Sequence, residues 1–133
     1  MDEEIIHEGG CFCGGVRYRV AGPPLAVAHC HCASCRRASG AAVVTWAIFP
    51  RDRFEVVAGE PARRASSPGV VRRHCARCGS PLTYETGRRP RHIDVTVGTL
   101  DRPEDFPPTM HVWTAERVPW LELADDLPRH AGG

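Results

Sequence analysis

The cysteines constrain this 133-residue chain more than any other feature, because they occur in tight clusters. The clusters are Cys11-Phe12-Cys13, Cys30-His31-Cys32-Ala33-Ser34-Cys35 and Cys75-Ala76-Arg77-Cys78. Thiolates that share one zinc ion must converge to about 2.3 Å from it, so clustered cysteines are typical of metal sites. Because the chain has 7 cysteines, they cannot all pair as disulfides. The spacing therefore predicts metal binding.

The first and third clusters each offer two sulfur ligands. If Cys11 and Cys13 lie on a strand, their side chains point to the same face. Cys75 and Cys78 precede Gly79, and this order is typical of a zinc knuckle, in which glycine accepts a positive φ. Together the two pairs predict a closed four-cysteine structural zinc site that closes a long loop and contributes strongly to folding. The alternative is a redox disulfide between Cys75 and Cys78, although no βαβ pattern surrounds them.

The middle cluster offers three thiolates and no fourth. Three protein ligands with one open position are the arrangement of a catalytic zinc, so Cys30, Cys32 and Cys35 are the candidate catalytic residues. The alternative is a second closed site that a histidine completes. The candidates for this fourth ligand are His29, His31, His74 and His111.

The open position of such a site would take water or a substrate. Arg36 and Arg37 directly follow the cluster, where a cation would stabilise thiolates and could hold an anionic substrate.

The hydrophobic pattern is that of a single all-β domain. Strands are expected at 16–20, 25–29, 42–49, 54–57, 70–74, 81–84, 93–97 and 110–113, with one helical turn at 34–39. The predicted core consists of Val16, Tyr18, Val43, Trp46, Ile48, Phe54, Val56, Leu82, Ile93, Val95, Val97, Trp113 and Trp120.

Composition excludes several function classes. All 17 basic residues are arginine, so a Schiff-base lysine mechanism is impossible. Adjacent arginines could suggest nucleic-acid binding, but seven thiolates and two zinc ions would make the formal net charge of +1 negative, which argues against it. No apolar stretch is long enough to cross a membrane and the first residues are acidic, so we expect a cytoplasmic protein. Oligomeric state leaves no signal in the sequence.

Several motifs together resemble one known family. They are Gly10-Cys11-Phe12-Cys13-Gly14, His29-Cys30-His31-Cys32-Ala33-Ser34-Cys35-Arg36-Arg37 with Gly40, Cys75-Ala76-Arg77-Cys78-Gly79-Ser80-Pro81-Leu82, Ile93-Asp94-Val95 with Gly98-Thr99-Leu100-Asp101, and Trp120-Leu121 with Asp126-Leu127-Pro128. The chain resembles the glutathione-dependent formaldehyde-activating enzyme family, which includes centromere protein V. The resemblance covers residues 9–129 as one domain, with tails at 1–8 and 130–133.

The resemblance implies a β-tent fold with two zinc ions per chain. Structural zinc would bind Cys11, Cys13, Cys75 and Cys78, and catalytic zinc would bind Cys30, Cys32 and Cys35. It implies a carbon–sulfur lyase activity: a thiol, glutathione or a similar one, adds to formaldehyde or a related small aldehyde. In that reaction zinc would favour the thiolate form of a thiol at the open position. The alkoxide that forms on addition needs a proton or a cation, and the nearest candidates in the sequence are Arg36, His29 and His31. The partners are then small molecules, with neither membrane nor nucleic acid. The competing hypothesis is a non-catalytic zinc module that binds protein or nucleic acid.

Overall fold

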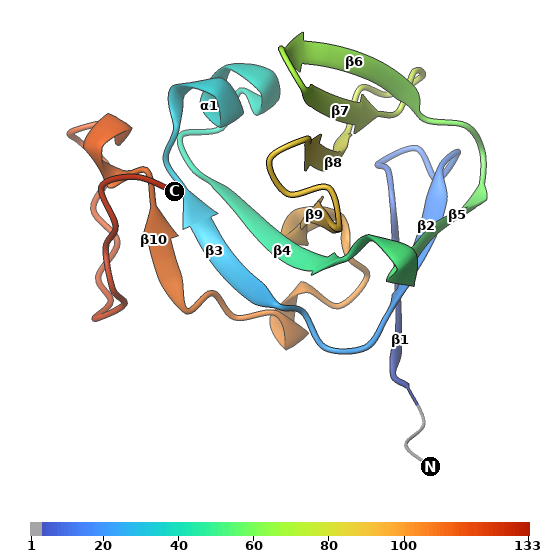
Figure 1. Ribbon diagram of the computed structural model, residues 1–133, viewed down its shortest axis with the longest axis horizontal. Coiled ribbons are helices and arrows are strands. Elements are labelled where there is room, and N and C mark those ends of the chain that lie inside the picture. The colour runs from blue at the N-terminus through green and yellow to red at the C-terminus, as the bar shows by residue number, and fades with distance from the viewer. Residues whose placement is uncertain (1–3) are drawn as a thin grey trace.

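The computed structural model describes residues 4–133 and is built from two β-sheets and one short α-helix (Figure 1). One sheet has three antiparallel strands, and the other has seven strands of which one edge pair is parallel. The predicted all-β class is therefore confirmed. Within the described part of the chain, no helix is long and apolar enough to span a bilayer.

The strand order of each sheet brings distant segments together. The three-stranded sheet has the order β1 (Ile6–Gly10), β2 (Arg17–Ala21), β5 (Phe54–Ala58). The seven-stranded sheet has the order β10 (Met110–Val112), β3 (Ala26–Cys30), β4 (Val44–Pro50), β9 (His92–Thr96), β8 (Pro81–Thr86), β7 (Val70–His74), β6 (Ala62–Ser67). The helix α1 spans Ala33–Ser39, and short 3₁₀ helices occupy Arg51–Arg53, Val97–Thr99, Pro103–Asp105 and Thr114–Glu116.

Two strands lie where the sequence pattern predicts none. β1 begins within the segment 1–8 that was expected to be a tail, of which residues 1–3 lie outside the described residues. Its Gly9 leaves room for the Tyr18 ring, which a Cβ at that position would meet. β6 is an edge strand whose residues are mostly exposed, so it shows no alternation of apolar side chains. Both strands are held by backbone pairing with a neighbour, which a hydrophobic pattern does not register.

The C-terminal residues 130–133 were also expected to be a tail. In the structure the His130 N–H donates to the His111 carbonyl at 2.9 Å, and the Trp113 N–H donates to the Gly132 carbonyl at 2.9 Å. The end of the chain thus lies against β10 (Figure 1).

The main core combines side chains from both sheets. Of the predicted core residues, Val16, Tyr18, Trp46, Leu82, Ile93, Val95 and Val97 are buried, and Val43, Ile48, Phe54 and Val56 are half-buried. Trp113 and Trp120 are corrections, because 39% and 74% of these residues is exposed. Both follow the last strand, in a segment with no further sheet to cover an aromatic ring.

Candidate metal centres and substrate pocket

Four cysteine sulfurs converge between the two sheets. The sulfurs of Cys11, Cys13, Cys75 and Cys78 all lie within 4.8 Å of one another. The Cys11 and Cys13 sulfurs are 3.6 Å apart, and those of Cys13 and Cys75 are 3.7 Å apart. Four sulfurs arranged tetrahedrally around zinc would be separated by ~3.8 Å. This donor set therefore fits a zinc ion.

The first pair of ligands lies in a turn rather than on a strand. Cys11 follows β1 directly, and the Gly14 N–H donates to its carbonyl at 3.1 Å. The Val16 N–H donates to the Cys11 sulfur at 3.2 Å, a contact that favours thiolate. Cys11 and Cys13 therefore do not lie on one strand, as the sequence argument assumed, although their sulfurs do converge.

The second pair forms the expected knuckle. The N–H groups of Arg77 and Cys78 both lie 3.4 Å from the Cys75 sulfur, and the Gly79 N–H donates to the Cys75 carbonyl at 2.9 Å. Gly79 has a φ of 82°, which favours glycine over residues with a Cβ. Because β1 belongs to one sheet and β7 to the other, the four-cysteine group links the two sheets.

The three remaining cysteines form a second, smaller group. Cys30 ends β3, Cys32 caps the N-terminus of α1 and Cys35 lies within that helix. Their sulfurs lie within 4.8 Å of one another, and those of Cys30 and Cys35 are 3.7 Å apart. No histidine or carboxylate of residues 4–133 joins this group. It fits a zinc ion with three protein ligands and one open position.

Without a metal ion, the surroundings of this group favour thiolate at Cys32 only. Hydrogen bonds with Cys32 and Cys35, together with burial, raise the pKa of Cys30. The Cys30 thiol lowers the pKa of Cys35, but Cys32 and burial outweigh this effect and raise it. The neighbouring thiols of Cys30 and Cys35 lower the pKa of Cys32 to about 2. The Cys35 N–H, which lies 3.3 Å from the Cys32 sulfur, and the Arg72 guanidinium lower the same pKa. A cationic zinc ion would stabilise all three thiolates together.

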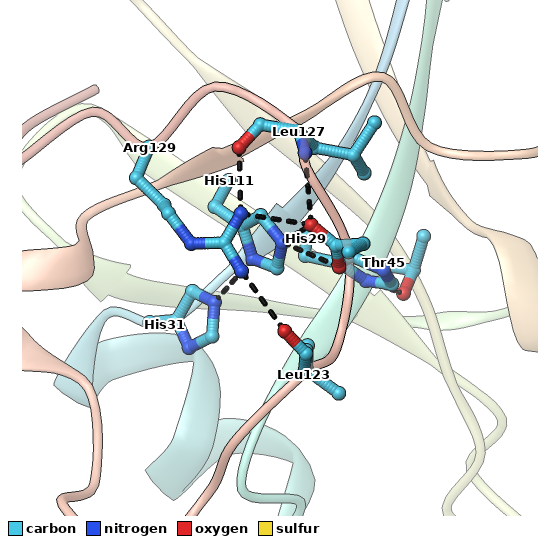
Figure 2. Close-up of polar contacts among 8 residues, drawn as sticks. His29, His31, Thr45, His111, Leu123, Leu127 and Arg129 are labelled. Carbon is cyan, nitrogen blue, oxygen red and sulfur yellow. Dashed lines mark hydrogen bonds and ion pairs between the residues drawn. The ribbon is translucent and has the colours of Figure 1, made fainter.

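The two histidines beside Cys30 contact Thr45 and His111 instead of the cysteines (Figure 2). Side chains alternate along β3, so His29 points away from the face that carries Cys30. His29 Nδ1 lies 2.8 Å from the Thr45 hydroxyl, and His31 Nε2 lies 2.9 Å from Nδ1 of His111. The alternative of a histidine as fourth ligand therefore finds no support in the described residues.

A carboxylate sets the proton positions in this histidine chain. Asp125 accepts from Nε2 of His111 at 3.0 Å, so Nδ1 of His111 is an acceptor and Nε2 of His31 must donate to it. Burial lowers the pKa of both His29 and His31, which favours the neutral ring. Partial burial opposes ionisation of Asp125, but hydrogen bonds from Arg129 and His111 lower its pKa to about 2. This network of hydrogen bonds attaches the C-terminal segment to the end of β3 (Figure 2).

A pocket of about 670 Å³ opens beside Cys35. Its walls come from α1, β4, β6, β7 and β8, which meet at one end of the molecule (Figure 1). The volume falls within the range of about 300–1,000 Å³ that is usual for small-molecule sites. The three-cysteine group therefore adjoins a space large enough for a substrate.

Arg72 is the cation that faces the cysteines. Its two terminal nitrogens lie 3.8 and 3.9 Å from the Cys35 sulfur, and its guanidinium carbon lies 4.8 Å from the centre of the Tyr84 ring. Arg36, the cation expected from the sequence, instead donates to the Glu116 carbonyl at 3.3 Å. Arg72 was missed because it lies 37 positions from Cys35, and only the pairing of β7 into the sheet brings the two together.

Fold and site together define a two-sheet domain with one four-cysteine and one three-cysteine group, each of which could hold a metal ion. The model of the family described as glutathione-dependent formaldehyde-activating enzyme matches residues 6–116, and the chain belongs to that family. All the cysteines of both groups lie inside the matched region. The resemblance seen in the sequence motifs is therefore confirmed.

One named relative agrees with this assignment, and one solved structure shares the fold. A Halomonas elongata protein, provisionally named a glutathione-dependent formaldehyde-activating enzyme, is 29% identical over 131 residues, covering 90% of this chain and 82% of the relative. The crystal structure of a Rhodobacter sphaeroides protein, a structural-genomics target, superposes with a TM-score of 0.60 and 19% identity. The match covers 92% of this chain and 98% of that chain, and it shows a shared fold.

Proposed function

We propose that this protein adds a thiol, glutathione or a similar one, to formaldehyde or a related small aldehyde, and catalyses the reverse carbon–sulfur lyase reaction. The observation that carries the proposal is the position of the three-cysteine group. Its Cys35 lines a pocket of about 670 Å³, and no fourth protein ligand from residues 4–133 joins the group.

The reaction needs a thiolate and a way to stabilise an oxygen anion. A carbon–sulfur bond forms as the carbonyl π bond breaks, and the oxygen then takes up the proton that the thiol has lost. A zinc ion on Cys30, Cys32 and Cys35 would supply the Lewis acidity that favours the thiolate form of a bound thiol.

Arg72 supplies positive charge at the same place. A guanidinium next to Cys35 offsets the negative charge that a further thiolate adds to three existing ones. It is also a charged hydrogen-bond donor for the oxygen anion that develops in the pocket. The stack on Tyr84 and a hydrogen bond of 3.1 Å from Arg72 Nε to the Ser66 hydroxyl hold the guanidinium in place.

The test measures S-hydroxymethyl adduct formation by NMR or mass detection, with the uncatalysed rate subtracted. We expect zinc-loaded protein to accelerate the reaction of glutathione with formaldehyde, and Cys32→Ser to lose this acceleration. Thermal melting of the variant checks that its fold persists.

The competing function is a zinc module that binds a macromolecule without catalysis. If no thiol in a screen against small aldehydes reacts faster than without protein, the proposal is wrong. A salt-dependent mobility shift with DNA in that same protein would then favour the binding module.

A further inference from the structure

The pocket beside Cys35 is strongly positive. Four arginines line it, namely Arg37, Arg64, Arg72 and Arg73, and no aspartate or glutamate does. The whole chain, by contrast, has nearly equal numbers of basic and acidic residues, 17 and 16. The local excess of positive charge therefore arises from how the fold distributes the charged residues.

Part of this charge has no carboxylate partner. Arg73 forms an ion pair with Glu85 at 2.9 Å. Arg37, Arg64 and Arg72 form no ion pair with any carboxylate of residues 4–133. The pocket thus retains positive charge that an anionic ligand could neutralise.

The strand register sets two of these arginines side by side. Arg64 on β6 is the direct cross-strand partner of Arg72 on β7. Like charges directly opposite each other destabilise a sheet, and a bound anion would relieve the repulsion. Arg37 lies on α1, so it reaches the same pocket from a different wall (Figure 1).

We propose that Arg37 and Arg64 form an anion subsite that holds the carboxylates of the thiol substrate. This inference rests on the proposed function, because it places the substrate sulfur at the three-cysteine group. Arg72 lies between the subsite and the cysteines, next to Cys35 on one side and Arg64 on the other. The substrate class is then a thiol that carries carboxylates.

The binding test uses two probes that share one skeleton. S-methylglutathione has both carboxylates but a blocked sulfur, and its diethyl ester lacks the two negative charges. Titration calorimetry on the zinc-loaded protein should show that S-methylglutathione binds on the order of tenfold more tightly than the ester. The difference should shrink as salt is raised, because both arginines are exposed at the rim.

The variants test the two arginines directly. We expect the double variant Arg37→Gln with Arg64→Gln to weaken S-methylglutathione binding about tenfold and to leave the ester unaffected. Arg63→Gln is the matched control, since Arg63 is the neighbouring exposed residue of β6 and does not line the pocket. Equal binding by the double variant and the native protein, or no preference of the native protein for the charged probe, would overturn the subsite.

The same experiment separates this inference from the proposed function. If the protein forms no aldehyde adduct but binds S-methylglutathione through these arginines, the subsite stands and the reaction is wrong. If adduct formation proceeds with the same KM for charged and neutral thiols and in the double variant, the reaction stands and the subsite is wrong.

Discussion

The contact of Arg72 with Cys35 gives a single side chain influence over the three-cysteine group. The guanidinium lies against the sulfur, a tyrosine ring and a serine hydroxyl, and it pairs with no carboxylate of residues 4–133. Positive charge in that position should matter most when a further thiolate enters. Arg72 should therefore stabilise the protein with a bound thiol more than the protein without one.

We therefore expect Arg72→Gln to weaken binding of glutathione to the cobalt-substituted protein roughly tenfold. Thiolate charge-transfer bands of the cobalt report the binding. Arg72→Lys should retain part of the affinity, because it keeps the charge and loses the planar fork. Arg63→Gln again serves as control, and equal affinities for glutathione in all four proteins would contradict a role for Arg72.

A second prediction at the scale of residues concerns the buried His111. His111→Phe keeps the ring but removes the nitrogen that accepts from His31, so it leaves a buried donor unpaired. The expected loss is about 1–3 kcal/mol in the free energy of unfolding. His130→Phe is the control, because His130 is exposed and its change should stay within about 0.5 kcal/mol. Similar unfolding energies for both variants would mean that the histidine chain adds no stability.

At the scale of elements, two glycines share the same positive φ but differ in how closely other atoms approach them. Gly59 follows β5 and Gly69 lies between β6 and β7, and both have a φ of 75°. A Cβ on Gly69 would meet nothing, whereas a Cβ on Gly59 would fall inside contact distance of the Gly15 carbonyl oxygen. A substitution of Gly69 therefore has to overcome only the unfavourable φ, whereas a substitution of Gly59 also produces a steric clash with backbone.

Gly69→Ala is expected to cost about 1–2 kcal/mol, because a residue with a Cβ rarely adopts this φ. Gly59→Ala should cost at least about 1 kcal/mol more, since backbone on both sides would have to shift. Denaturant unfolding of the two variants measures the difference. Equal losses in the free energy of unfolding would show that the turn beside Gly15 can shift at little energetic cost.

At the scale of the whole molecule, the two cysteine groups differ in what they connect. The four-cysteine group joins a turn after β1 to the knuckle after β7, and these strands belong to different sheets. The three-cysteine group connects only the end of β3 with the start of α1. Loss of the first should therefore affect folding, and loss of the second should affect chemistry.

Cys78→Ser should lower the free energy of unfolding by at least about 3 kcal/mol or abolish soluble expression. Cys32→Ser should melt close to the native protein, because serine at this position still caps α1. Activity should disappear in Cys32→Ser. Thermal melting and adduct formation are measured on both, and equal destabilisation without a selective loss of activity would favour two structural sites.

The two groups should also release metal at different rates. A slow chelator titration with metal analysis should show two phases, the first from the three-thiolate group that has an open position. Competing glutathione should slow the first phase if it occupies that position. A single phase with one zinc retained throughout would mean that the three-cysteine group holds no zinc.

Local spacing carried much of the information about this protein. The residues of each tight cluster are close along the chain, so a local turn or strand is enough to bring their sulfurs together, and their grouping could be predicted before the structure was known. The family motifs were sufficient to indicate the joining of Cys11 and Cys13 with Cys75 and Cys78. Strands with alternating apolar residues, such as β2, were recognisable for the same local reason.

The sheet order decided the rest of the site. Arg72 reaches Cys35 and Arg64 because β7 pairs with β6 and both strands face α1 across the pocket. His31 turned away from the cysteines because His111 and Asp125 arrive beside β3 from the end of the chain. Contacts of this kind depend on the register and order of strands that are distant in sequence. A local pattern does not encode them, so they appear only when the whole chain is folded.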